Sequence, residues 1–176
     1  MQRILIIFSL VLLAASCNNG GITGERLPPK PASVQLVVDL IRGGKYTATR
    51  VGTHFLSTDS TITWLDPKPG EKFEQEIVDE MKTLQLQLNP DSIVTVRYKG
   101  KEHTGTYSVD DNPGDDQKPG IKLRLTYVDE EFRMGEGPAM KITYTYVVEG
   151  INKDEILLLT PRSMNNKSLI VLFSRN

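Results

Sequence analysis

Cysteine and histidine, the side chains behind much nucleophilic and metal-dependent chemistry, are nearly absent from this chain. Its 176 residues include one cysteine, Cys17, and two histidines, His54 and His103, which are isolated in sequence. A single thiol forms no intramolecular disulfide, and no zinc-ligand spacing surrounds these residues. The Gly-x-Ser-x-Gly turn that carries many serine nucleophiles is also missing. We therefore predict no catalytic residues, no metal site and no cofactor, and expect a protein that is not an enzyme.

An excess of either charge is also lacking. The chain carries 21 Lys and Arg against 22 Asp and Glu, for a formal net charge of -1 at pH 7. Nucleic acids and anionic membrane surfaces bind proteins largely through clustered positive charge, so this balance favours neither as a partner. The length suits one domain with a sizeable hydrophobic core.

No apolar run is long enough to span a bilayer. The apolar segment Ile4–Leu13 falls short of the roughly 18 residues that a transmembrane helix needs. Arg3 precedes it, and a few small residues separate it from Cys17. A short apolar core between a basic start and small residues is typical of a secretory signal peptide. We therefore predict a signal peptide over residues 1–16.

The end of this segment resembles the lipobox of bacterial lipoproteins, in which small residues precede an invariant cysteine. Ala15, Ser16 and Cys17 match that pattern, whereas Ala14 stands where Leu, Val or Ile is usual. The resemblance implies cleavage before Cys17 and acylation of this cysteine with chains such as palmitate. Asn18, in place of Asp, implies the outer membrane, with the domain in the periplasm or at the cell surface. Several acyl chains anchor stably, because each buried methylene adds about 0.8 kcal/mol.

Residues 17–31 are predicted to form the lipidated N-terminus and a flexible tether, because glycine and proline are frequent and no hydrophobic period is visible. Residues 32–176 are then one domain. Apolar residues at three- and four-residue intervals predict a short helix over 34–41, ending at Gly43-Gly44, with a strand as the alternative. Phe73, Ile77 and Met81 predict a second short helix over 71–81.

The rest of the domain alternates apolar and polar residues with a period of two. In the plainest case Leu84, Leu86 and Leu88 face one way and the intervening glutamines face the other. Similar segments lie at 45–51, 94–98, 106–109, 121–127, 141–148, 155–160 and 168–174, and a short ninth piece at 61–65. Because closure removes exposed strand edges, we predict a mainly β fold, an antiparallel up-and-down barrel of eight strands.

The order of elements from about Leu36 to Arg175 resembles the lipocalin-like barrels of small bacterial lipoproteins. Gly44-Lys45-Tyr46 stands where that family has Gly-x-Trp, and Leu172–Arg175 stands at its closing strand. In lipocalins the Trp packs under an Arg and seals the closed end. The resemblance implies that Tyr46 and Arg175 meet here, with cation–π character. The sole tryptophan, Trp64, lies in another segment.

The inward faces of such a barrel are apolar with several phenol groups. An eight-stranded barrel is just wide enough to be filled by its own side chains or to hold one small ligand. A buried hydroxyl needs a hydrogen-bond partner, which favours a pocket. We therefore predict a small apolar or amphipathic ligand, bound by Tyr98, Tyr107, Tyr127, Tyr144, Tyr146, Leu123 and Leu125. The alternative is a filled barrel that serves as a structural or adaptor subunit and docks on another envelope protein through its loops.

Two acidic segments remain. Residues 110–116 carry several oxygen ligands of the kind that calcium prefers. An EF-hand loop starting at Asp110 would need Glu at its twelfth position, where this chain has Ile121, so a solvated hairpin loop is the simpler interpretation. Residues 129–135 are predicted as a long connection whose Phe132 and Met134 could lie at the barrel mouth.

Overall fold

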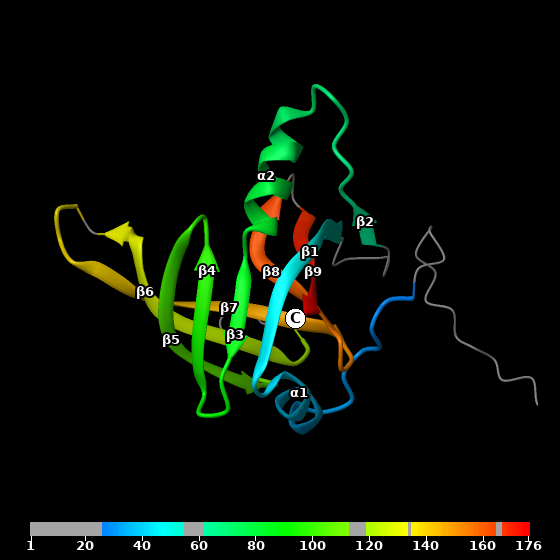
Figure 1. Ribbon diagram of the computed structural model, residues 1–176, viewed down its shortest axis with the longest axis vertical. Coiled ribbons are helices and arrows are strands. Elements are labelled where there is room, and N and C mark those ends of the chain that lie inside the picture. The colour runs from blue at the N-terminus through cyan, green and yellow to red at the C-terminus, as the bar shows by residue number, and fades with distance from the viewer. Residues whose placement is uncertain (1–25, 55–61, 113–118, 134, 165–166) are drawn as a thin grey trace, which may run out of the picture.

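The computed structural model describes residues 26–54, 62–112, 119–133, 135–164 and 167–176 (Figure 1). These residues form two helices and nine strands. In chain order the elements are α1 (Val34–Ile41), β1 (Gly44–His54), β2 (Ile62–Trp64), α2 (Lys72–Lys82), β3 (Gln85–Leu88), β4 (Ile93–Tyr98), β5 (Lys101–Asp110), β6 (Lys122–Arg133), β7 (Ala139–Ile151), β8 (Glu155–Met164) and β9 (Lys167–Arg175).

The strands form one antiparallel sheet that closes on itself. From β3 to β9 each strand pairs with the next in sequence, and β3 also pairs with β1. Closure comes from β1 and β9, which pair from Tyr46 opposite Arg175 to His54 opposite Ser168. The short β2 adds to the far end of β1. The predicted mainly β, antiparallel, eight-stranded barrel with short helices is confirmed, and β2 is the ninth piece.

The first helix covers one end of the barrel. Ser33 caps α1, because its side chain accepts a hydrogen bond from the backbone N–H of Leu36 at 3.2 Å. Val37 and Ile41 are fully buried against the strands. The helix ends before Gly43, whose positive φ of 69° suits glycine. The three valines of this segment therefore lie in a helix and not in the alternative strand.

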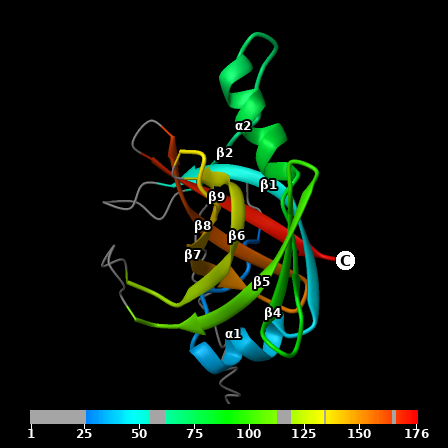
Figure 2. The same cartoon turned by 90° about the vertical axis from the view of Figure 1, so that its left-hand side faces the viewer.

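The second helix stands at the opposite end of the barrel from α1 (Figures 1 and 2). It lies between β2 and β3 in the chain and packs on the barrel through Val78 and Met81, each 3% exposed. Phe73, near its start, is 62% exposed. The predicted helix over 71–81 is thus present, and its buried face is formed mainly by its C-terminal half.

Much of the barrel interior is filled by its own side chains. Alternate residues of β3, β4, β6, β8 and β9 point inward, as expected for strands with a period of two. The following interior side chains are at most 1% exposed: Leu86, Val96, Leu123, Leu125, Leu158, Val171 and Phe173. Each such side chain stabilises the fold by about 1.5–3 kcal/mol relative to an exposed one.

A second apolar cluster lies on the outer face of β7, β8 and β9. It is formed by Val147, Leu157, Leu159, Ile170 and Leu172, with Ile62 and Trp64 of β2 packed against it. The Cζ atom of Arg50 lies 4.2 Å from the ring centroid of Trp64. Strands buried on both faces have near-continuous apolar sequences, which accounts for the runs in β8 and β9.

Two segments expected to be loops belong to strands. The prediction of a long connection over 129–135 is wrong, because β6 continues to Arg133 and β7 begins at Ala139. Likewise, β8 continues beyond the predicted strand over 155–160 to Met164, and β9 begins at Lys167, so the connection between them is shorter than the gap between the predicted strands. Residues 130–133 are exposed on both faces of β6, so no alternation of apolar and polar residues marks them. Met134 lies outside the described residues.

The described part of the predicted tether begins at Arg26 and lies partly on the barrel. The carbonyl of Pro29 accepts a hydrogen bond from the N–H of Ile151 at 2.9 Å. Pro28 is buried against Gly150, where an added Cβ would lie 2.4 Å from the Pro28 carbonyl oxygen. Pro28 and Pro29 therefore lie against the end of β7, within the range predicted to be a flexible tether. Cys17 and the predicted signal peptide lie outside the described residues.

Candidate functional site

The end of the barrel beneath α1 is sealed by hydrogen bonds to a backbone carbonyl. The Tyr46 hydroxyl donates to the Leu40 carbonyl at 3.3 Å, and Arg175 Nη1 donates to the same oxygen at 3.1 Å. The Arg175 Cζ atom lies 5.8 Å from the Tyr46 ring centroid. Burial raises the pKa of the Tyr46 phenol, and the positive charge of Arg175 opposes this rise.

Glycine precedes this tyrosine for a steric reason. A Cβ added to Gly44 would lie 2.3 Å from Cε2 of Tyr46, so the tyrosine ring occupies the space of the missing side chain. At the same end the Tyr107 hydroxyl donates to the Asn89 carbonyl at 2.8 Å. The two tyrosines at this end therefore bond to backbone carbonyls.

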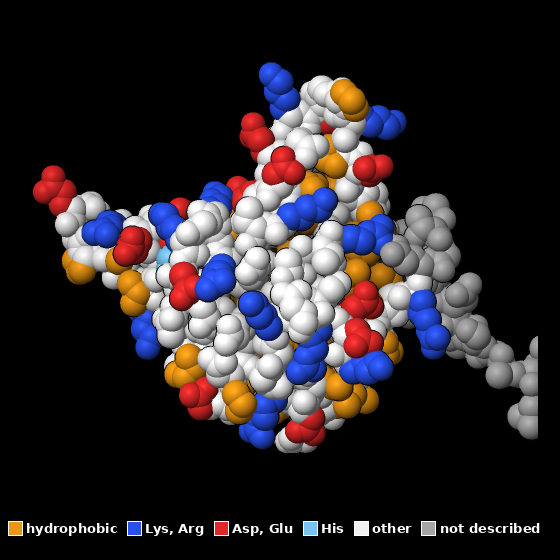
Figure 3. All heavy atoms as spheres, viewed as in Figure 1, with side chains coloured by type: hydrophobic (Ala, Val, Ile, Leu, Met, Phe, Trp, Pro, Cys, Tyr) orange, Lys and Arg blue, Asp and Glu red, His pale blue; other side chains and the backbone are white. Residues whose placement is uncertain are grey.

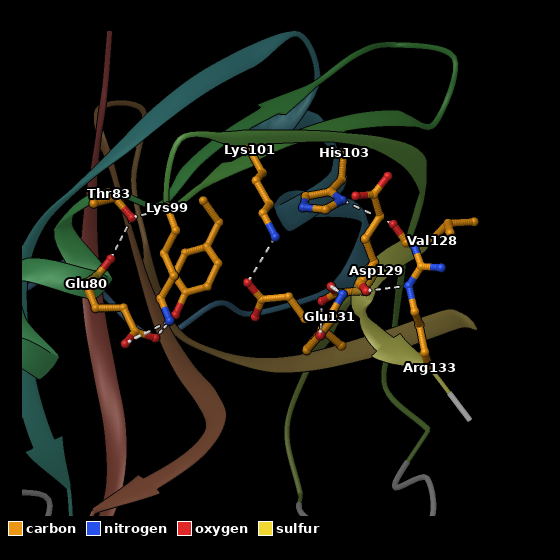
Figure 4. A network of polar contacts seen from close by, with 12 residues as sticks. Glu80, Thr83, Lys99, Lys101, His103, Val128, Asp129, Glu131 and Arg133 are labelled. Atoms are coloured by element: carbon orange, nitrogen blue, oxygen red, sulfur yellow. Dashed lines mark hydrogen bonds and ion pairs between the residues drawn. The ribbon is translucent and has the colours of Figure 1, made fainter. Parts of the chain in front are cut away.

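A pocket lies at the opposite end, next to α2. Water-sized molecules can occupy about 50 Å³ inside it, and the whole hollow, including the part that opens to solvent, measures about 490 Å³. Its described lining comes from α2, β4, β6, β7, β8 and the residue before β3: Met81, Leu84, Tyr98, Tyr127, Asp129, Glu131, Phe132, Tyr144, Tyr146 and Thr160. Figure 4 shows the polar contacts around it.

The structure brings together some of the predicted binding residues and separates others. Tyr98, Tyr127, Tyr144 and Tyr146 all line the pocket. Three residues predicted to bind ligand do not: Leu123 and Leu125 are fully buried in the packed interior, and Tyr107 lies at the sealed end. Asp129, Glu131 and Thr160 line the pocket but are not among the residues that the sequence predicts to bind ligand. The first two belong to the segment 129–135, whose composition predicts a loop.

Two of the pocket tyrosines stack on each other. Tyr127 and Tyr144, diagonal neighbours on β6 and β7, stack with centroids 5.2 Å apart and an angle of 22° between ring planes. On the other side of Tyr127, the ring of His103 lies at 5.1 Å. Stacking of this kind orients the rings relative to one another.

Asp129 is the buried acid of the pocket. It is 9% exposed and accepts two hydrogen bonds, from the Tyr144 hydroxyl at 2.6 Å and from the Glu131 backbone N–H at 2.9 Å. Burial alone would raise the pKa of Asp129, but these hydrogen bonds and the nearby His103 and Lys101 together hold it below the ordinary value. The group is therefore a carboxylate at neutral pH.

The barrel wall opens beside this pocket. The paired residues of β5 and β6 end at Gly105 opposite Tyr127, and from there β5 pairs only with β4. Side chains bridge the two strands beyond that point (Figure 4): Lys101 Nζ lies 3.3 Å from Glu131 Oε1, and His103 Nδ1 lies 3.1 Å from the Val128 carbonyl oxygen. The rim of the pocket is thus held by side chains and not by a strand ladder.

The other rim is formed by α2. Glu80 accepts a hydrogen bond from the Tyr98 hydroxyl and lies 3.2 Å from Lys99 Nζ. The Lys99 backbone N–H donates to the Thr83 hydroxyl at 3.0 Å. These contacts tie the end of α2 to the turn between β4 and β5, and so fix the position of Met81 over the pocket.

Within the described residues, no group of three or more His, Cys, Asp or Glu side chains could hold a metal ion. Asp110 of the acidic segment pairs with Arg124, whose Nε lies 2.8 Å from Asp110 Oδ2. The hydrogen bond from Arg124 lowers the pKa of Asp110. Residues 113–118, which include most of the acidic segment considered for calcium binding, lie outside the described residues. His103 lies by the pocket, and His54 ends β1.

A closed antiparallel meander of eight strands with a helix over one end defines this chain as a lipocalin-like barrel. Comparisons with protein-family models, with curated proteins and with solved structures find no match to the chain. In the part of the chain that the structure describes, no helix has the length and apolar character needed to cross a membrane.

Proposed function

We propose that this chain is a lipid-anchored protein of the bacterial envelope whose barrel binds a small apolar or amphipathic molecule. The observation that carries the proposal is the tyrosine-lined pocket at the end of the barrel next to α2. The mouth of a β-barrel is a common place for ligand sites. Binding, and not catalysis, is the proposed activity.

The packed interior limits what the pocket can hold. The volume open to water-sized molecules, about 50 Å³, lies well below the range of about 300–1,000 Å³ that is usual for sites that enclose a drug-sized molecule. The enclosed part, about 50 Å³ for water-sized molecules, has room for only a few waters, at roughly 10–15 Å³ each. We therefore expect a ligand that inserts a compact group and leaves the rest at the mouth.

Native mass spectrometry of the mature protein purified from its own host tests this proposal. We expect a bound small molecule that is lost in a Tyr127→Ala, Tyr144→Ala double variant. Tyr107→Phe is the matched control, because Tyr107 lies at the sealed end and its loss leaves the pocket intact. A consistently empty wild-type protein, together with no binding from host lipid extracts, would contradict ligand binding.

The anchor is tested separately. Acylation of Cys17 predicts an intact mass that includes fatty acyl chains and a mature chain that begins at this residue. We expect Cys17→Ser to lose the acyl mass and to leave the membrane fraction. A wild-type chain without acyl mass would leave only a secreted barrel.

Exposed apolar side chains favour the adaptor role as a second candidate. Val128 and Phe132 are each 50% exposed and Met140 is 42% exposed, all on the arm that β6 and β7 form beyond the barrel. Figure 3 shows hydrophobic side chains along this arm. In-cell crosslinking from position 132 should then capture one stoichiometric envelope protein. Recovery of the chain only as a free monomer would count against this role.

A further inference from the structure

We infer that the ligand of this pocket is a cation: an amphipathic ammonium compound, a primary amine or a quaternary ammonium, with Asp129 as its counter-ion. The inference rests on the proposed binding function and names the class of molecule bound. It is carried by a buried carboxylate that has no ion-pair partner among the described residues and lies in a cavity lined by tyrosine rings.

The first step is the charge of Asp129. An ionised carboxylate offers about four acceptor positions, and the two hydrogen bonds from Tyr144 and the Glu131 N–H occupy only part of them. No described residue forms an ion pair with Asp129. A buried charge is costly unless a partner of opposite charge meets it. Asp129 is thus a charged group on the pocket surface with capacity left for a cation.

The second step concerns the partners of the basic side chains near the pocket. Lys101 is paired with Glu131 across the opening between β5 and β6, and Lys99 is paired with Glu80 of α2. His103 directs Nδ1 to the Val128 carbonyl. The charges of His103 and Lys101 lower the pKa of Asp129. The described charged residues in the pocket lining, Asp129 and Glu131, are both acids. An anionic headgroup placed there would meet a carboxylate.

The third step is the aromatic surface. A cation is attracted to the face of a tyrosine ring within about 6 Å of its centroid, more strongly where water is excluded. Tyr127 and Tyr144 are stacked 5.2 Å apart beside Asp129, and Tyr98 and Tyr146 also line the pocket. A pocket that combines a carboxylate with tyrosine rings suits an ammonium group better than a neutral alcohol, and an alcohol better than a carboxylate.

Three probes of equal chain length test the charge preference directly: hexylammonium, 1-hexanol and hexanoate. We propose titration calorimetry on the full chain held in lipid nanodiscs, with empty nanodiscs as the blank. We expect hexylammonium to bind at least about tenfold more tightly than either of the other probes, which corresponds to about 1.4 kcal/mol. Equal or weaker binding of hexylammonium relative to 1-hexanol would overturn the inference and leave the proposed function standing. If none of the three binds, the proposed function falls as well.

Variants of Asp129 test whether this residue causes the preference for hexylammonium. Asp129→Asn keeps the shape and removes the charge, so we expect it to lose the preference for hexylammonium while 1-hexanol binds as before. Asp129→Glu restores the charge and should restore part of the preference. Asp110→Asn is the matched control, because this acid pairs with Arg124 away from the pocket lining. A preference that survives Asp129→Asn would overturn the role of Asp129. If that variant does not fold, the three-probe comparison on the wild-type chain decides the ligand class.

Discussion

The two ends of the barrel use tyrosine in different ways. At the end beneath α1, the hydroxyls of Tyr46 and Tyr107 donate to the backbone carbonyls of Leu40 and Asn89. At the end beside α2, the hydroxyls of Tyr98 and Tyr144 donate to the carboxylates of Glu80 and Asp129. A backbone carbonyl is fixed by the fold, whereas a carboxylate has further acceptor positions and a charge.

This difference separates a structural tyrosine from a binding tyrosine. A hydroxyl that meets a backbone carbonyl satisfies both groups and closes the barrel. A hydroxyl that meets a carboxylate inside a cavity satisfies one acceptor position and leaves a polar surface for another molecule. All four residues are tyrosines on strands, so the hydrogen-bond partner is the observation that distinguishes the two ends.

The largest expected effect is a difference in the free energy of unfolding between a substitution in the packed interior and one at the pocket rim. Phe173 is fully buried and Phe132 is 50% exposed. We expect Phe173→Ala to lower the free energy of unfolding by about 3–5 kcal/mol, because it leaves a cavity. Phe132→Ala should change it by no more than about 0.5 kcal/mol. Urea denaturation measures both, and equal losses would mean that the two regions do not differ in packing.

The tyrosine comparison is sharpened by a matched pair of hydroxyl deletions. Tyr107→Phe removes the bond to the Asn89 carbonyl and should cost about 1–2 kcal/mol of stability, with ligand binding unchanged. Tyr144→Phe removes the bond to Asp129 and should weaken ligand binding. Thermal unfolding and calorimetric titration, run on both variants, give the two readouts. A binding defect in Tyr107→Phe would contradict the division between the ends.

The pH dependence of stability should reflect Asp129. Its folded-state pKa lies below the ordinary value of 3.8, so the carboxylate contributes stability above that value and loses it as pH falls through the folded pKa. We therefore expect acid unfolding of the wild-type chain to be steeper below about pH 4 than that of Asp129→Asn. Urea midpoints at a series of pH values measure this. Identical slopes would show that Asp129 titrates alike in folded and unfolded chains.

The smallest expected effect concerns the bridge at the pocket rim. Lys101 and Glu131 pair with side chains 49% and 46% exposed, respectively. Exposed ion pairs contribute about 0–1 kcal/mol, so Lys101→Met should change the free energy of unfolding by less than about 1 kcal/mol. Denaturant titration at low and high salt measures it. A larger loss would mean that the bridge holds the wall between β5 and β6 together.

Segments with a clear period were predictable, and segments exposed or buried on both faces were less so. Leu84, Leu86 and Leu88 alternate with glutamines because one face of that strand is buried and the other is wet. Residues 130–133 extend beyond the wall with both faces exposed, so their acidic composition suggested a loop. The local sequence does not show whether such a segment forms a strand or a loop.

The candidate site was predictable only in part for a related reason. The period of two placed Tyr107 and Tyr127 on the same inward surface, but their distance from α1 depends on strand register across the barrel. Register also decides that Asp129 meets Tyr144, fifteen positions away in sequence. These relations arise from the pairing of β6 with β7, which no single segment specifies.

The shared carbonyl of Leu40 has a consequence for the order of folding. It accepts hydrogen bonds from Tyr46, near the start of the first strand, and from Arg175, which lies 135 positions after Leu40 in the chain. Contacts between such distant residues form late, because the entropy of closing a long loop must be overcome first. We expect the seal beneath α1 to be among the last contacts to form, so a folding intermediate would carry a nearly complete meander that is still open along its seam.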